Sequence, residues 1–405
     1  GLDLGKYEWQ LKRINSLGQE SDLSTPQEIE AGIFTKYYGG SSDDRAKQII
    51  PSNSGGYIVL ATTKSPEISA TAGPLADDWV FKVDREGDII WQYISSANGR
   101  DRFNNIIEMT DGSIVIVGND WDSEKAIVLK INSEGEEIWK VLYRPEDISE
   151  RYDFISVIEF NNSILALGVQ RGNTVRRYYL HEISIIDGFV SAQVDIPAPA
   201  IPDLESFDVS KLGVTSSKNL IISGMAYKED NQFYQGQGAF LQILDDNFSQ
   251  ISTWNGIDSL MHLNVGDTVE LSDGSFALIG QHPAGGDVSI SIINSDDASS
   301  DSCQYYDVFY DDELIVTGDN GIIYGIFTDY STNHNSALVF MSVNTELTSD
   351  KQALYTNFRE YTHPVGLIKN TENSFIFVVN EPQNDNDSST RDIVLFKRGE
   401  SNLEF

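Results

Sequence analysis

Apolar residues in this chain occur in short runs that are bounded by glycine, asparagine, aspartate or serine. Tyr57–Ala61 follows a Gly-Gly step, and Ile114–Val117 and Phe276–Ile279 each follow an Asp-Gly-Ser step. β-Branched and aromatic residues fill these runs, and Asp-Gly or Asn-Gly steps favour the positive φ of tight hairpin turns. The roughly 3.6-residue period of an amphipathic helix is absent from the sequence. The pattern predicts an all-β protein of short antiparallel strands.

The same strand pattern recurs along the whole chain. Its copies end at residues 61, 118, 168, 224, 280, 325 and 379, which gives seven units. Each unit has one further strand before this run and two after it, and four-stranded units of about 40–50 residues are typical of β-propellers. We therefore predict a seven-bladed propeller of four-stranded antiparallel blades. Trp9–Asn15 looks like a third strand without its first two, which leaves an eight-bladed ring as the alternative.

The two ends of the chain complement each other. The last unit has its third strand at Asp392–Phe396 and only the short remnant Ser401–Phe405 to follow it. Gly32–Tyr38 resembles the fourth strand of a blade. We predict that this strand pairs into the last blade, because radial closure protects the edges that an open sheet exposes. Residues 1–32 then form a partly extended N-terminal segment, and residues 33–405 form a single propeller domain.

Two segments match at a constant offset of 48 residues. The paired positions are Lys82 and Lys130, Gly87 and Gly135, and Trp91 and Trp139. One supersecondary unit is therefore used twice.

The elements Tyr38–Asp44, Gly55–Val59 and Trp79–Trp91 resemble the repeat of large secreted propellers common in Bacteroidetes. The match extends over residues 33–143, and later units lose the terminal tryptophan. The resemblance implies an extracellular, outer-membrane-surface or periplasmic protein, with lipid anchoring as one mode of attachment, and it implies no reaction. The glycine and tryptophan that close a blade are also loosely similar to the docking motifs of quinoprotein-like propellers. That likeness implies that Trp91 and Trp139 pack on neighbouring blades.

Composition excludes several classes of partner. The chain has 28 basic and 62 acidic residues and a formal charge of −34, which repels nucleic acid and anionic lipid. No apolar run approaches the roughly 18 residues that a membrane-spanning helix needs. The single cysteine, Cys303, cannot form an internal disulfide. We expect a monomer with a glycan or protein ligand.

Signatures of catalysis and of metal binding are missing from the sequence. There is no His-Glu-x-x-His pair, no Gly-x-Ser-x-Gly elbow and no phosphate-binding loop, and the five histidines belong to different units. The segment Asp385–Ser389 begins like a calcium loop, but Thr390 stands where that loop needs glycine. We predict no catalytic residue, no metal and no cofactor.

Our leading hypothesis is a non-catalytic, secreted or surface-displayed propeller that binds a glycan, a peptide or a partner protein. The alternative is a propeller glycoside hydrolase or lyase whose carboxylates meet at the axis. Its candidate acid and base residues are Asp44, Glu108, Glu159 and Asp267.

The loop lengths indicate where a ligand would bind. Loops between the second and third strands, and loops between units, are long, whereas the other turns are short. Because strands alternate in direction, all the long loops emerge on one face of the disc, and binding residues favour such loops. We therefore expect a ligand on this face, near the axial mouth, with Tyr227, Phe233 and Tyr234 as aromatic contacts.

Overall fold

A computed structural model describes most of the chain. The described residues are 5–16, 18–31, 33–71, 76–95, 101–145, 150–171, 176–228, 237–255, 265–281, 288–294, 300–306, 314–317, 322–329, 337–344, 349–355, 362–370, 374–384 and 387–399. Among them no helix is long and apolar enough to cross a membrane.

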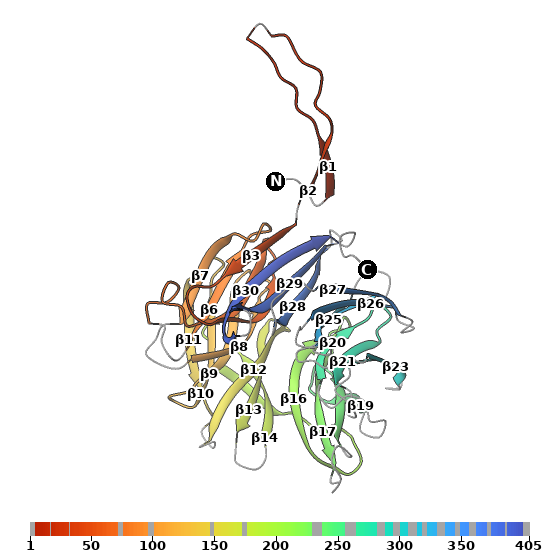
Figure 1. Cartoon of the computed structure of the whole chain (residues 1–405). Coiled ribbons are helices and arrows are strands. Elements are labelled where there is room, and N and C mark those ends of the chain that lie inside the picture. The colour runs from red at the N-terminus through yellow and green to blue at the C-terminus, as the bar shows by residue number, and fades with distance from the viewer. Residues whose placement is uncertain are drawn as a thin grey trace.

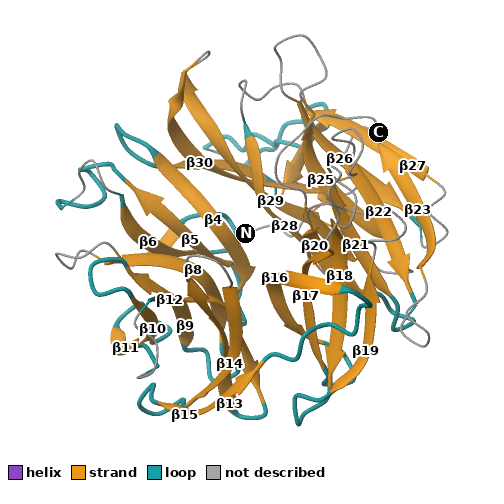
Figure 2. Cartoon of the chain, turned by 90° about the horizontal axis from the view of Figure 1, so that it is seen from below, coloured by secondary structure: helices purple, strands orange, loops and turns teal. Residues whose placement is uncertain are grey.

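The strands of the N-terminal half form three four-stranded antiparallel sheets arranged around a common centre (Figure 2). The first blade contains β4 (Asp44–Pro51), β5 (Tyr57–Thr63), β6 (Asp77–Val83) and β7 (Ile89–Ser95). The second contains β8 (Asp101–Glu108), β9 (Ile114–Asp120), β10 (Lys125–Ile131) and β11 (Glu137–Tyr143). The third contains β12 (Arg151–Phe160), β13 (Ser163–Arg171), β14 (Arg176–Ile183) and β15 (Val190–Asp195).

Three further sheets repeat this order in the C-terminal half. The fourth blade contains β16 (Leu204–Val214), β17 (Leu220–Lys228), β18 (Gln237–Leu244) and β19 (Gln250–Asn255). The fifth contains β20 (Val265–Glu270), β21 (Phe276–Gln281), β22 (Val288–Ile293) and β23 (Ser300–Tyr306). The sixth contains β24 (Leu314–Thr317), β25 (Ile323–Asp329), β26 (Ala337–Val343) and β27 (Ser349–Tyr355).

The remaining four-stranded sheet combines both ends of the chain. It contains β28 (His363–Asn370), β29 (Ser374–Asn384), β30 (Asp387–Gly399) and, as its outer strand, β3 (Phe34–Tyr38). β3 is antiparallel to β30 over five residue pairs, from Phe34 opposite Lys397 to Tyr38 opposite Ile393. We call the contact of this composite sheet with the first blade the seam.

The all-β propeller class is correct, but the prediction of a seven-bladed ring, with an eight-bladed ring as the alternative, needs correction. Six blades are continuous four-stranded units, whereas the seventh sheet is a composite of three C-terminal strands and one N-terminal strand. The eight-bladed alternative is wrong, because Trp9–Asn15, which looks like a third strand without its first two, belongs to a separate hairpin. In that hairpin β1 (Gly5–Trp9) pairs only with β2 (Gln27–Ala31). Figure 1 shows it projecting away from the ring.

The core lies between neighbouring blades. Second and third strands are buried on both faces, as the nearly continuous burial of β5 and β6 shows, whereas the outer strand β7 is largely exposed. One apolar cluster joins Leu60 and Val80 of the first blade to Phe103 and Ile116 of the second. Burial stabilises by about 25 cal/mol per Å² of apolar surface, so this face-to-face packing of sheets holds the ring together.

Candidate binding sites

The inner strands share an irregularity that faces the axis. In six of them the pairing with the second strand shifts by one residue, so that one extra residue is inserted. The inserted residues are Lys47, Asn104, Ile155, Ser210, Gly266 and Val365. A bulge redirects side chains locally and is frequent next to functional sites. Here the bulges repeat around the ring and place polar groups at its centre.

These bulges line an axial cavity of about 460 Å³. Its polar lining residues are Lys47, Gln48, Asn104, Asn105, Ser156, Ser210, Lys211, Ser223 and Asp267, and its apolar ones include Ile49, Ile155 and Val365. The described wall therefore mixes amide, hydroxyl and ammonium groups with aliphatic patches. Such a wall suits a neutral, hydroxyl-rich molecule better than a purely apolar one.

Two amide side chains of the lining hold adjacent blades together. Gln48 Oε1 accepts hydrogen bonds from Asn105 Nδ2 at 2.9 Å and from the Ile106 amide at 3.0 Å. Asn105 Oδ1 in turn accepts one from the Val157 amide at 2.9 Å. These amides are structural braces between the first three blades.

Lys47, too, forms its polar contacts with other residues of the ring. Its Nζ lies 2.9 Å from Asp78 Oδ1 and donates to the Phe103 carbonyl at 2.7 Å. Asp78 is buried, and burial raises its pKa to about 6 although Lys47 and the Phe103 amide lower it. The more accessible lining groups lie on the fourth blade, where the Lys211 side chain is 47% exposed and Ser210 is exposed.

The four carboxylates of the enzyme alternative lie in different environments. Glu108 accepts hydrogen bonds from Ser52 Oγ and the Asn53 amide, and Glu159 accepts them from Thr110. Each glutamate thus binds the turn between the first and second strands of the preceding blade, which we call the first turn of that blade. This role repeats at Glu270, which binds Ser216 in the same way.

The other two candidates are separated as well. Asp44 is fully buried and accepts hydrogen bonds from Ser65 Oγ at 2.6 Å and the Gly40 amide at 2.8 Å. Asp267 is the one carboxylate among the described residues that line the axial cavity, and it forms an ion pair with Lys211. The pair of carboxyl groups that glycoside hydrolysis requires is therefore not assembled from these four residues.

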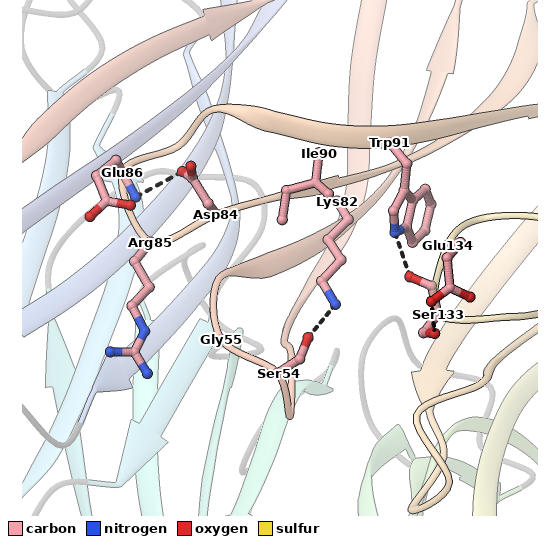
Figure 3. A pocket seen from close by; sticks show the side chains of 10 residues that line it. All are labelled: Ser54, Gly55, Lys82, Asp84, Arg85, Glu86, Ile90, Trp91, Ser133 and Glu134. Carbon is pink, nitrogen blue, oxygen red and sulfur yellow. Dashed lines mark hydrogen bonds between the residues drawn. The ribbon is translucent and has the colours of Figure 1, made fainter.

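A second cavity lies between the first and second blades, on the face of the short turns. It measures about 650 Å³. The first blade contributes Ser54, Gly55, Lys82, Asp84, Arg85, Glu86, Ile90 and Trp91, and the second contributes Ser133 and Glu134 (Figure 3). We call it the inter-blade pocket.

The tryptophans predicted to be structural contact the neighbouring blade. A side chain at Gly135 would collide with the Trp91 ring, and Trp91 Nε1 donates to the Ser133 carbonyl at 2.8 Å. Trp139 lies against Gly188 in the same way, and its Nε1 donates to the Ile185 carbonyl at 3.3 Å. Both rings are only partly buried, and Trp91 keeps a surface toward the inter-blade pocket.

The predicted aromatic contacts remain predictions. Phe233 and Tyr234 lie outside the described residues. Tyr227 lies in β17, where its hydroxyl donates to Asp208 Oδ2 at 3.3 Å. Tyr178 and Arg176 bind the same carboxylate, at 2.8 and 3.0 Å. Burial, and then the charge of Asp208, raise the pKa of Tyr227, so its hydroxyl stays a donor at neutral pH.

The described residues include two of the five histidines, His181 and His363. His181 is buried, and its Nε2 lies 2.6 Å from the Tyr152 hydroxyl. His262, His282 and His334 lie outside the described residues, as do Asp385 and Asn386 of the segment that begins like a calcium loop. Within the described part of the chain, no three His, Cys, Asp or Glu side chains are grouped as metal ligands.

Apart from Asp267, the residues that line the two cavities were not predicted from the sequence. Bulges leave no recognisable residue pattern in one chain, because the inserted positions carry lysine, asparagine, isoleucine, serine, glycine and valine. The inter-blade pocket had a detectable signal: aligning the first two units places Ser54 where the second unit has Asp111.

Comparison with known proteins identifies the fold. No protein-family model and no curated protein matches the sequence. Among solved structures, the Dos1 propeller matches with a TM-score of 0.53 and 10% identity over 95% of this chain and 80% of its own. The Cps50 (Swd1) β-propeller domain of Myceliophteria thermophila matches with a TM-score of 0.52 and 10% identity over 90% of this chain and 98% of its own.

A further match comes from B. thetaiotaomicron. It is the extracellular domain of the hybrid two-component system BT3049, with a TM-score of 0.49 and 13% identity over 89% of this chain and 41% of that one. The chain has a β-propeller fold. At these identities the likeness shows the fold alone.

Proposed function

We propose that this chain is a non-catalytic binding propeller, secreted or displayed on the cell surface, that holds a neutral glycan in its axial cavity. The observation that carries the proposal is the composition of the described cavity wall. It offers amides, hydroxyls and two lysines, and both lysines are paired: Lys47 with Asp78, and Lys211 with Asp267, the one described carboxylate of the wall. A hydroxyl-rich ligand finds donors and acceptors there, whereas the described wall offers no second carboxylate for two-carboxylate hydrolysis.

The test fills the cavity with a bulky side chain and leaves the hydrogen bonds between the blades intact. Ser210 is exposed on the cavity wall, and its side chain, unlike those of Gln48 and Asn105, forms no hydrogen bond with a described residue. Binding of cellohexaose, xylohexaose and laminarihexaose to the full chain is measured by calorimetry. We expect at least one of them to bind, and the bulky Ser210→Trp substitution to weaken that binding by about tenfold or more, because it fills the space that the sugar occupies.

Ile251→Trp is the matched control. Ile251 lies on the outer strand of the same blade and is 55% exposed, so the same bulk is added away from the axis. Affinity should stay at the wild-type value. Equal affinities for both variants, or no binding of any hexasaccharide, would overturn the axial site. Release of shorter sugars by the wild type, abolished by Asp267→Asn, would instead establish the enzyme.

A further inference from the structure

Two buried lysines occupy equivalent places in the first two blades. Lys82 lies opposite Trp91 in the pairing of β6 with β7, and Lys130 lies opposite Trp139 in the pairing of β10 with β11. Lys82 is 4% exposed and Lys130 is 5% exposed. Both therefore hold an ammonium group below the surface, beside the first turn of their own blade.

Those first turns also correspond residue by residue. The Gly55 amide donates to the Ser52 carbonyl, and the Gly112 amide donates to the Met109 carbonyl. Ser54 therefore takes the position that Asp111 has in the second blade. This alignment rests on backbone hydrogen bonds as well as on sequence.

In the second blade the lysine is paired. Lys130 Nζ lies 3.3 Å from Asp111 Oδ2 and 3.4 Å from the carbonyl of Ile185 in the third blade. A buried ammonium group is costly unless its charge and protons are satisfied. The second blade meets that requirement within the chain.

In the first blade the carboxylate is missing. Lys82 Nζ donates to Ser54 Oγ at 2.6 Å, and no described carboxylate lies within ion-pair distance of it. The Lys82 ammonium group has three N–H donors and a positive charge. The neutral Ser54 hydroxyl accepts one hydrogen bond, so it does not balance the charge or use the other donors. The position thus calls for an external oxyanion.

The inter-blade pocket lies at this position. Figure 3 shows Lys82 reaching toward Ser54, between Arg85 and Trp91. Arg85 is exposed and pairs with no carboxylate that the structure describes, so it adds a second cation. Trp91 and Ile90 provide apolar surface, and Glu86 and Glu134 provide carboxylate acceptors among the lining residues.

We propose that the inter-blade pocket binds a carboxylate-bearing sugar, with the ligand carboxylate taking the place that Asp111 has in the second blade. The carboxylate accepts from Lys82 Nζ and Arg85, and the sugar ring packs against the Trp91 indole. Glu86 and Glu134 accept from sugar hydroxyls, a role for which a peptide offers fewer donors. A volume of about 650 Å³ lies within the usual range for a small-molecule site. This site is separate from the axial cavity and independent of the proposed function.

Titration of the full chain with digalacturonate tests the proposal, with its methyl ester as the neutral counterpart. We expect the acid to bind at least about tenfold more tightly than the ester, because a buried charged site discriminates against a ligand that leaves it unpaired. Ser54→Asp should reduce affinity for the acid by a similar factor, since it supplies Lys82 with an internal partner. Ser54→Asn adds nearly the same bulk without charge and should retain most of the affinity.

Two further comparisons separate the explanations. Asp111→Ser changes the second blade and should leave digalacturonate affinity at the first unchanged, and Ser210→Trp in the axial cavity should do the same. Equal binding of acid and ester, equal losses in Ser54→Asp and Ser54→Asn, or no binding of the acid would overturn the proposal. Tighter binding of the peptide Gly-Gly-Trp than of digalacturonate would assign the pocket to a peptide carboxylate and overturn the sugar.

Discussion

The interfaces inside the ring and the seam that closes it use the same contact with different chain connectivity. Inside the ring, Trp91 of the first blade lies on Gly135 of the second, and Trp139 of the second lies on Gly188 of the third. The φ angles of these glycines are 84° and 75°, in the region that side chains disfavour. A bare, left-handed turn therefore receives an aromatic ring from the preceding blade.

At the seam the aromatic residue comes from the other end of the chain. Tyr38 of β3 lies against Gly87, whose φ is 83°, and its hydroxyl donates to the Gly87 carbonyl at 2.6 Å. Asn380 adds a bidentate contact to Ala46, at 2.8 and 3.0 Å. An aromatic residue of the outer strand thus packs on a glycine turn of the following blade in both cases, whether that strand follows its own sheet in sequence or comes from the other end of the chain. β3 takes the outer-strand position of the composite sheet.

We expect the largest effect from removing β3, tested by two N-terminal deletions that end on either side of this strand. Deletion of residues 1–38 removes β3 together with the hairpin and leaves β30 as an open edge. We expect a loss of roughly 5 kcal/mol in unfolding free energy, because the buried Tyr38 and the partly buried Phe34 each contribute about 1.5–3 kcal/mol and the ladder is lost as well. Urea denaturation and gel filtration measure the loss of stability and any aggregation.

Deletion of residues 1–31 is the matched control, because it removes only the hairpin. Leu11 and Ile14 are 64% and 62% exposed there, so their removal costs the ring little. The shorter deletion should unfold at the wild-type urea concentration. Equal stabilities of the two truncated chains would refute closure by β3.

The tryptophans of the internal interfaces give the next largest effect. Trp139→Ala should cost about 2–3 kcal/mol, below the range of about 3–5 for a fully buried ring, since the side chain is only partly buried. Trp91→Ala should cost a similar amount, and the two costs should add because different blades receive the rings. Chemical denaturation gives both values. Ile138→Ala, at a residue that is 52% exposed, is the control and should change little.

The sequence predicts the fold well where repeats carry the information. Alternating turn residues and apolar runs identify four strands per unit, and the matched Lys, Gly and Trp positions indicate one unit used twice. The hairpin and the cavities escape this reasoning. The segment that begins at Trp9 has the residue pattern of a blade strand, but β1, which ends at Trp9, pairs with Gln27–Ala31. Which strand pairs with which depends on the segments that lie close in the folded chain, and the pattern of one segment does not contain that information. Axial side chains meet only because bulges and ring closure join residues far apart in sequence.

Acid should weaken an internal interface of the ring, at His181. His181 is buried beside Tyr143 and Phe154, at ring-centroid distances of 5.1 and 5.2 Å, and burial lowers its pKa to about 3. In the unfolded chain the His181 imidazole becomes protonated near pH 6.5, whereas in the folded chain it stays neutral until about pH 3. The free energy of unfolding therefore falls as the pH decreases from about 6.5 toward 3. Between pH 7 and 5 the loss from this group is about 2 kcal/mol.

Urea denaturation at both pH values measures it in the wild type and in His181→Gln, which keeps a polar partner for Tyr152 but does not titrate. The stability difference between pH 7 and 5 should be smaller in the variant by about that amount. Parallel pH profiles for the two proteins would contradict the assignment to His181.

The smallest effect isolates the hydrogen bond of the seam. Burial raises the pKa of Tyr38, so its hydroxyl remains a donor to Gly87 throughout the neutral range. Tyr38→Phe keeps the ring on the glycine and removes only this bond, which should cost about 1 kcal/mol because the Gly87 carbonyl loses its partner. Tyr37→Phe is the control on the same strand, since Tyr37 is 62% exposed. If Tyr38→Phe unfolds at the same urea concentration as Tyr37→Phe, ring packing alone holds β3 to the first blade, and the seam would then resemble the internal interfaces in packing but not in hydrogen bonding.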